Sequence, residues 1–142
     1  MKAIILSIAL SLTSFLLSAQ AETEVTTEGT TITVTVPVKS NEGHVIFGLY
    51  DEYSFMKNPL VGLESTIVDG KATVTFTDVT PGTYAILLFH DKNDNKQMDF
   101  DTSGMPLEMY GVSNNIMSMG PPMWSDAKFE VAGEPIELDI RM

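Results

Sequence analysis

Alternating aspartate and asparagine side chains between His90 and Asp101 are the residues best suited to chemistry. Hard cations such as calcium take about six to eight oxygen ligands from a tight loop, and Asp and Asn side chains supply such oxygens. The same eleven residues 91–101 carry four carboxylates, which repel one another unless a positive charge lies among them. We therefore predict a cation site. Its predicted ligands are Asp91, Asn93, Asn95, the backbone carbonyl of Gln97, and Asp99.

The spacing of these residues follows the calcium loop of EF-hand type, with Asp91 at position 1 and Asp99 at position 9. Two positions differ from that template. Lys96 stands at position 6, where glycine normally makes a sharp turn, and Thr102 stands at position 12 in place of a bidentate glutamate. A residue other than glycine in a left-handed conformation costs roughly 1 kcal/mol, and a lysine also adds a positive charge.

A bidentate ligand could come from outside the loop, and Asp101 and Glu108 are the nearest candidates. With an incomplete ligand set we expect weak calcium binding, around 10⁻⁴ to 10⁻³ M, as in extracellular modules. The alternative is a solvated turn without an ion, because turns favour Asp and Asn in any case.

Methionines form a second group with chemical potential, in a chain without cysteine. They fall within nineteen residues: Met105, Met109, Met117, Met119 and Met123. Thioethers select Cu(I), so a copper-handling site is one hypothesis, with His44 or His90 adding a nitrogen ligand. Methionine also fills gaps beneath irregular loops, and packing or surface exposure is the simpler interpretation.

No constellation typical of an enzyme is visible, neither a nucleophile elbow nor a phosphate-binding glycine loop. We therefore predict a protein that is not an enzyme. For His90, which ends an apolar run, a structural hydrogen bond is favoured over catalysis. Tyr110 and Trp124 could form a platform for a sugar or a peptide, or could cover an open end of the fold.

The first 21 residues resemble a secretory signal peptide, with a basic residue at Lys2, an apolar stretch from Ile4 to Leu17, and an Ala-x-Ala site ending at Ala21. We expect cleavage near Ala21, an extracytoplasmic location (periplasmic or secreted), and no membrane span in the mature chain. Cleavage would remove Lys2 and change the formal net charge from −11 to −12. That acidity argues against nucleic acid as a partner. It is compatible with cation binding and equally with plain solubility.

Hydrophobic periodicity predicts a flexible lead over residues 22–29 and one all-β domain over residues 30–142. Apolar residues alternate with threonines from Thr30, and Asp69-Gly70 is a strong hairpin signal. The expected strands cover residues 30–36, 44–50, 63–68, 71–76, 83–89, 127–131 and 136–140, with 83–89 as a central strand covered on both faces. About seven short strands with regular turns predict a β-sandwich, with a long irregular loop, residues 102–125, between the fifth and sixth strands.

Two runs in the second half carry a family resemblance. The sequence is similar to the pattern H-D-x-N-x-N-G-x-x-D followed by G-x-P-x-E-x-Y-G-x-S-N of a family of small secreted bacterial proteins, domain of unknown function 2141. It matches at His90, Asp91, Asn93, Asn95, Asp99, Gly104, Pro106, Glu108, Tyr110, Gly111, Ser113 and Asn114. It differs at Lys96, where the pattern has glycine.

The resemblance implies an immunoglobulin-like or transthyretin-like sandwich outside the cytoplasm, and it implies no activity. Together with the residues, it favours a binding module in which a cation held by the loop and by Glu108 orders the long loop for a protein or carbohydrate partner. A Cu(I)-handling protein and a structural or interaction domain without a metal are the alternatives.

Overall fold

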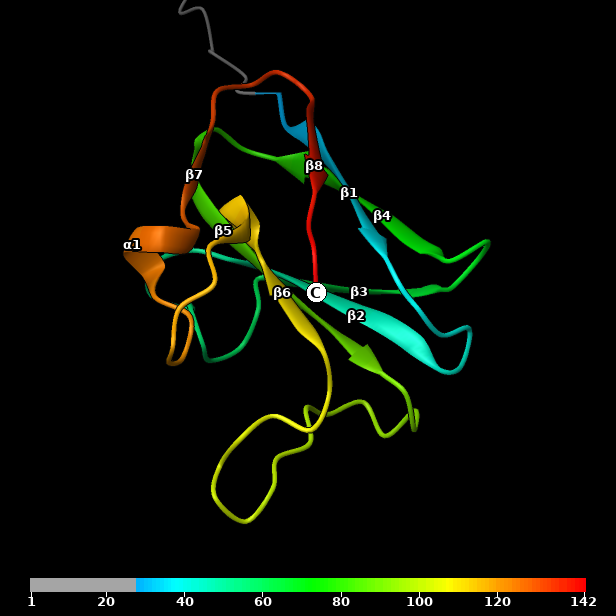
Figure 1. Ribbon diagram of the computed structural model, residues 1–142. Helices are drawn as coiled ribbons and strands as arrows, with labels where there is room; N and C mark the ends of the chain where they lie inside the picture. The colour runs from blue at the N-terminus through cyan, green and yellow to red at the C-terminus, as the bar shows by residue number, and fades with distance from the viewer. Residues whose placement is uncertain (1–27) are drawn as a thin grey trace, which may run out of the picture.

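The computed structural model describes residues 28–142, so the predicted signal peptide and residues 22–27 of the predicted lead lie outside the described part. Eight strands account for most of its regular structure (Figure 1). They are β1 (Thr30–Pro37), β2 (His44–Tyr50), β3 (Val61–Thr66), β4 (Lys71–Val79), β5 (Gly82–Asp91), β6 (Tyr110–Val112), β7 (Phe129–Val131) and β8 (Ile136–Asp139). No helix in this part of the chain is long and apolar enough to cross a membrane.

The strands form two sheets, which confirms the predicted all-β sandwich. One sheet has the order β4-β1-β8, and the other has the order β3-β2-β5-β6 with β7 also paired to β5. Most neighbours are antiparallel, but β8 runs parallel to β1, with Ile32 opposite Ile136. The C-terminal strand thereby closes the smaller sheet beside the first strand of the domain (Figure 1).

Side chains that alternate along the strands make the main core between the sheets. On β1, Ile32, Val34 and Val36 are buried, whereas the threonines between them lie on the outer face. Cross-strand hydroxyl pairs stabilise that outer face, for example Thr33 Oγ1 with Thr75 Oγ1 at 3.1 Å. The other sheet contributes Phe47 from β2 to the same core.

Strand β5 is central and covered on both faces, as its nearly continuous apolar sequence predicted. It pairs with β2, β6 and β7. Its Ile86 and Leu88 join the main core. Its other face carries Ala85 and Leu87, which belong to a smaller apolar cluster. This central position makes β5 the rigid support for the acidic segment that follows it.

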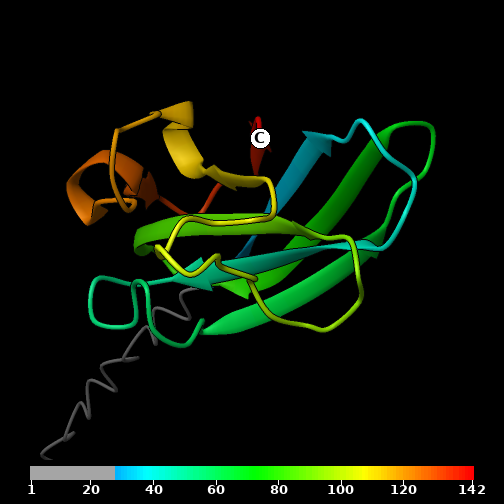
Figure 2. The ribbon, with the colours of Figure 1, turned by 60° about the horizontal axis from the view of Figure 1, so that its bottom comes forward.

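The segment expected to be irregular contains three short elements: β6, a 3-10 turn η1 (Ser113–Asn115), and one helical turn α1 (Trp124–Ala127). Strand β6 is too short to show a period in the sequence, and it forms because it pairs with β5, with Gly111 opposite Leu88. A Cβ at Gly111 would lie 2.7 Å from the carbonyl oxygen of Arg141, so this close approach requires glycine. Figure 2 shows α1 and η1 together at one end of the molecule.

Candidate functional site

The acidic loop, residues 91–99, begins where β5 ends, and the turn between β1 and β2 packs against its start. His90 is buried, and its Nε2 lies 2.6 Å from the carbonyl oxygen of Glu42, which is a structural hydrogen bond of the kind the sequence favours. Gly43, with φ +70°, makes the turn, and a side chain there would collide with the backbone carbonyl of Asp91. The Lys92 ammonium lies 3.1 Å from the Glu42 carboxylate. The loop therefore starts from a fixed base.

Asp91 organises the backbone of the loop from within. Its side chain is fully buried. One carboxylate oxygen accepts the N–H of Asn95 at 3.1 Å, and the other accepts the N–H of Lys96 at 2.9 Å. Lys96 has φ 63°, the left-handed conformation that glycine provides at position 6 of the calcium-loop template. The backbone turn of that template is thus present even though its glycine is not.

The side chains of Asn93 and Asn95 converge on Asp99. Each side-chain amide donates to one carboxylate oxygen of Asp99, both at 2.7 Å. Their amide oxygens accept backbone N–H groups, from Asn95 at 3.3 Å and from Gln97 at 3.0 Å. Three of the predicted ligands, Asn93, Asn95 and Asp99, therefore lie together, and Asp91 joins them through the backbone N–H of Asn95. The Gln97 carbonyl stays a predicted ligand.

Glu108 reaches back to the loop, and Asp101 does not. The two carboxylate oxygens of Glu108 accept the backbone N–H groups of Lys92 at 3.3 Å and Asp99 at 3.2 Å, which ties the two ends of the loop together. Asp101 instead accepts the Ser103 hydroxyl at 2.6 Å and the Met105 N–H at 2.9 Å, within its own turn. The Ser103 hydroxyl lowers the pKa of Asp101. Of the two candidates for an additional ligand, only Glu108 lies at the loop.

Two loop side chains point outward and attach to the sheet. Asp94 Oδ1 lies 2.5 Å from His44 Nδ1 on β2, and the Lys96 ammonium lies 2.6 Å from the Glu64 carboxylate on β3. The hydrogen bond with Glu64 raises the pKa of Lys96 and lowers that of Glu64. These contacts could not be predicted from the sequence, because they depend on which strands are neighbours in the sheet.

The oxygen atoms of the loop determine which ligands an ion could bind there. Within residues 28–142, no group of three or more His, Asp or Glu side chains is arranged to hold a metal ion by itself. The loop offers the amide oxygens of Asn93 and Asn95 besides the carboxylates of Asp91 and Asp99. Hard divalent cations accept such mixed oxygen ligands. A hollow beside the loop is lined by Glu42, Lys92, Asn93, Asp99, Phe100, Leu107 and Glu108.

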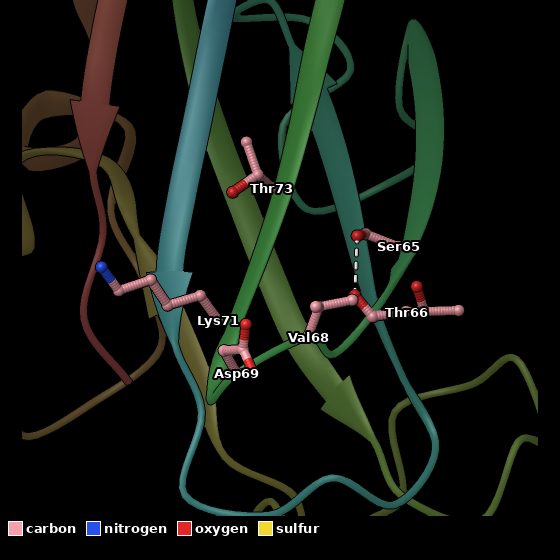
Figure 3. A pocket seen from close by; sticks show the side chains of 6 residues that line it. All are labelled: Ser65, Thr66, Val68, Asp69, Lys71 and Thr73. Atoms are coloured by element: carbon pink, nitrogen blue, oxygen red, sulfur yellow. Dashed lines mark hydrogen bonds between the residues drawn. The ribbon is translucent and has the colours of Figure 1, made fainter.

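A second hollow lies at the hairpin of β3 and β4 (Figure 3). Its lining residues are Ser65, Thr66, Val68, Asp69, Lys71 and Thr73. The Ser65 hydroxyl is used locally, since it donates to the Thr66 carbonyl at 2.9 Å. None of the predicted site residues lines this hollow, which combines four short polar side chains with Lys71 and the apolar Val68.

The five methionines of residues 105–123 are all exposed, from 57% at Met109 and Met123 to full exposure at Met119. None belongs to the main core or to the smaller apolar cluster. The structure therefore shows these methionines on the surface and not packed beneath the loop. Copper(I) binding through Met117, Met119 and Met123 stays a prediction.

Tyr110 and Trp124 are partly buried and pack on the smaller cluster of Ala85, Val112 and Ala127. Trp124 also contacts Phe55 edge to face, with ring centroids 5.6 Å apart. These contacts match the covering role expected of the two rings.

Ser113, Asn114 and Asn115 fasten the end of the domain, a role the sequence interpretation missed. The buried Ser113 hydroxyl accepts the Ile86 N–H at 3.0 Å and donates to the Ala127 carbonyl at 2.5 Å. Asn114 donates to the carbonyls of Asp126 and Lys128, and Asn115 pairs with the backbone of Asp139 and Arg141. The match of Ser113 and Asn114 to the family pattern is one signal for this role, and the paired asparagines are another, since asparagine tolerates the positive φ that both adopt.

The fold and the loop define a β-sandwich domain that carries an ordered Asp/Asn loop at the end of its central strand. Residues 32–139 match the family described as "Uncharacterized protein conserved in bacteria (DUF2141)", so the chain belongs to this family. No curated protein and no solved structure gave a match.

Proposed function

We propose that the domain is a non-enzymatic calcium-binding module that acts outside the cytoplasm. The observation that carries the proposal is the backbone of the loop: Asp91 accepts the N–H groups of positions 5 and 6, and Lys96 takes the left-handed conformation of the template glycine. The first position of the loop is a fully buried carboxylate, and its two hydrogen bonds hold the loop backbone in this turn.

Ion binding would exchange partners around Asp99. The amides of Asn93 and Asn95 now donate to the two carboxylate oxygens of Asp99. Calcium would take the place of the amide N–H donors at Asp99, and the amide oxygens of Asn93 and Asn95 would be among its ligands. Asp91 and Asp99 would supply the carboxylate oxygens, and the Gln97 carbonyl would supply another oxygen.

Glu108 would transmit the ordering effect of ion binding to the segment that follows the loop. It bonds both Lys92 and Asp99, and the Leu107 N–H donates to the Asp99 carbonyl at 2.8 Å. Ordering Asp99 therefore also orders residues 100–108, where Phe100 and Leu107 are exposed. In this proposal, calcium fixes the surface that a protein or carbohydrate partner meets.

Thermal unfolding of the chelator-treated protein, with and without millimolar calcium, tests the proposal. A ligand that binds only the folded state adds about 0.4 to 1.4 kcal/mol of stability at about one to ten times Kd, which is the excess of millimolar calcium over a Kd of about 10⁻⁴ to 10⁻³ M. We expect calcium to raise the midpoint of the wild-type protein and to have little effect on Asp99→Asn, which keeps the shape of the side chain.

Asp69→Asn is the matched control, because it removes the same charge from an exposed turn that tolerates asparagine. It should respond to calcium as the wild type does. An unchanged wild-type midpoint at millimolar calcium, or an equal response from Asp99→Asn, would contradict the proposal.

A further inference from the structure

The methionines of this domain lie on its surface, although methionine is among the residues most often buried. Six of the eight methionines in residues 28–142 are exposed: Met56, Met105, Met109, Met117, Met119 and Met123. Met142 packs against the main core, and Met98 is partly buried. The chain has no cysteine, so its oxidisable sulfur is all in thioethers.

We propose that these six methionines act as a reversible sink for oxidants such as hypochlorous acid. Each thioether sulfur gives an electron pair to the oxidant and gains one oxygen atom, so that thioether and hypochlorous acid yield sulfoxide, a proton and chloride. The step needs no further reactant. Methionine sulfoxide reductases reverse it, with one enzyme for each sulfoxide epimer: two thiols of the reductase system supply two electrons and two protons and become a disulfide, and the oxygen atom leaves as water.

The exposure of these side chains makes them reactive. Met117 is 77% exposed and Met119 is fully exposed, so an oxidant reaches the sulfur without any opening of the fold. The most exposed sulfurs should therefore react first, and Met98 and Met142 last.

The position of the six methionines also makes oxidation harmless to the fold. Oxidation converts an apolar side chain into a polar one and disrupts a core that contains it. None of the six belongs to either apolar cluster, so their sulfoxides remain in water. The domain can then be oxidised and reduced repeatedly while it stays folded.

The test is a competition for hypochlorite between the purified protein and a methionine-dependent reporter enzyme. The comparison is a variant with leucine at the six exposed positions, such as Met117→Leu and Met119→Leu, which keeps the apolar bulk and cannot be oxidised. Peptide mass spectrometry maps each sulfoxide, and thermal unfolding follows the fold.

We expect the wild-type protein to consume about six equivalents of hypochlorite before the reporter loses activity, and the variant to protect far less. The thermal midpoint should stay within about 2 °C, since substitutions at exposed sites hardly affect stability, and the two reductases should restore the unmodified mass. Equal protection by the variant, or loss of the folded state while only exposed methionines are oxidised, would overturn the proposal. The variant retains every residue of the acidic loop, so calcium binding is tested separately.

Discussion

Buried polar side chains at two positions form hydrogen bonds with backbone groups that have no partner within the β-sheets. Asp91 satisfies two N–H groups of the acidic loop, and Ser113 joins Ile86 of β5 to Ala127 at the end of α1. Within residues 28–142, no buried side-chain nitrogen or oxygen lacks a hydrogen-bond partner. Removing one such group leaves its partners unsatisfied, which costs more than the bond itself contributes.

Replacement of Ser113 by alanine tests this at a single residue. The change leaves a buried N–H and a buried carbonyl without a hydrogen-bond partner. We therefore expect Ser113→Ala to lower the free energy of unfolding, measured by urea unfolding, by about 2 kcal/mol. Ser118→Ala is the control, because the exposed Ser118 hydroxyl bonds only the nearby Gly120 carbonyl. It should fall within about 0.5 kcal/mol of the wild type, and an equal loss in both variants would count against the role of Ser113.

Lys96 opposes calcium through its positive charge, and a lysine adopts the left-handed backbone that the loop needs less readily than a glycine does. We predict that Lys96→Gly strengthens calcium binding several-fold, because glycine adopts this conformation freely and the charge is removed. Calcium titration calorimetry measures the effect. Lys96→Gln removes the charge alone and should give a smaller gain. Weaker binding by Lys96→Gly than by the wild type would refute the assignment of Lys96 to position 6.

At the scale of elements, α1 is attached to the outer face of β5 by aromatic packing. Trp124 lies on the smaller cluster and meets Phe55, which in turn contacts Tyr50 at 6.1 Å between ring centroids. A single helical turn has no stability of its own. These rings must therefore supply much of what keeps α1 in place.

A double-mutant cycle with Phe55→Ala and Trp124→Ala tests this attachment. We expect a coupling energy of about 0.5 to 1.5 kcal/mol, as for other edge-to-face pairs, measured by urea unfolding. Tyr53→Ala provides the control, since Tyr53 is 84% exposed, and its effect should add to that of Trp124→Ala within about 0.5 kcal/mol. Full additivity for Phe55 and Trp124 would mean that the contact does not hold α1.

The longer strands could be predicted from the sequence, and the short elements could not. Alternation over Ile32, Val34 and Val36 predicted β1, because one face of that strand is buried. Strand β6 and the turns η1 and α1 have three or four residues each, too few for a period to show. They depend on contacts with β5 and on Asn114 and Asn115, which long-range pairing brings into place.

The acidic loop shows the same division between local and long-range information. Its candidate oxygen ligands could be predicted from their spacing alone, because residues that are close in a loop's sequence are also close in space. The sequence left two candidates for a ligand from outside the loop, Asp101 and Glu108, and only Glu108 contacts the loop. The attachments of Asp94 to His44 and of Lys96 to Glu64 could not be foreseen, because they require the register of β2, β3 and β5.

For the whole molecule, carboxyls that accept hydrogen bonds in the folded state make stability depend on pH. Asp51, Glu64 and Asp101 have lowered pKa values, chiefly through the hydrogen bonds they accept from Ser54, Lys96 and Ser103. A carboxyl whose folded pKa is lowered contributes stability that is complete above its ordinary value, 3.8 for Asp and 4.5 for Glu, and that is lost as the pH falls through the lowered value.

Urea unfolding between pH 7 and pH 3 checks this dependence. We expect a nearly constant free energy of unfolding down to about pH 5 and a decline below it. Asp101→Asn should decline less steeply, because it removes one of the carboxyls concerned. Stability that rises on acidification would contradict the assignment of these hydrogen bonds.

Calcium titration of the ¹⁵N-labelled protein, followed residue by residue in amide NMR spectra, tests the central claim most directly. We predict saturable shifts at millimolar calcium, largest for Asn95, Lys96 and Gln97, with smaller shifts near Glu108 and none at the β3–β4 hairpin. Small shifts spread over the acidic surface without saturation, or no shifts at all, would mean that the loop is an ordered turn and not a calcium site.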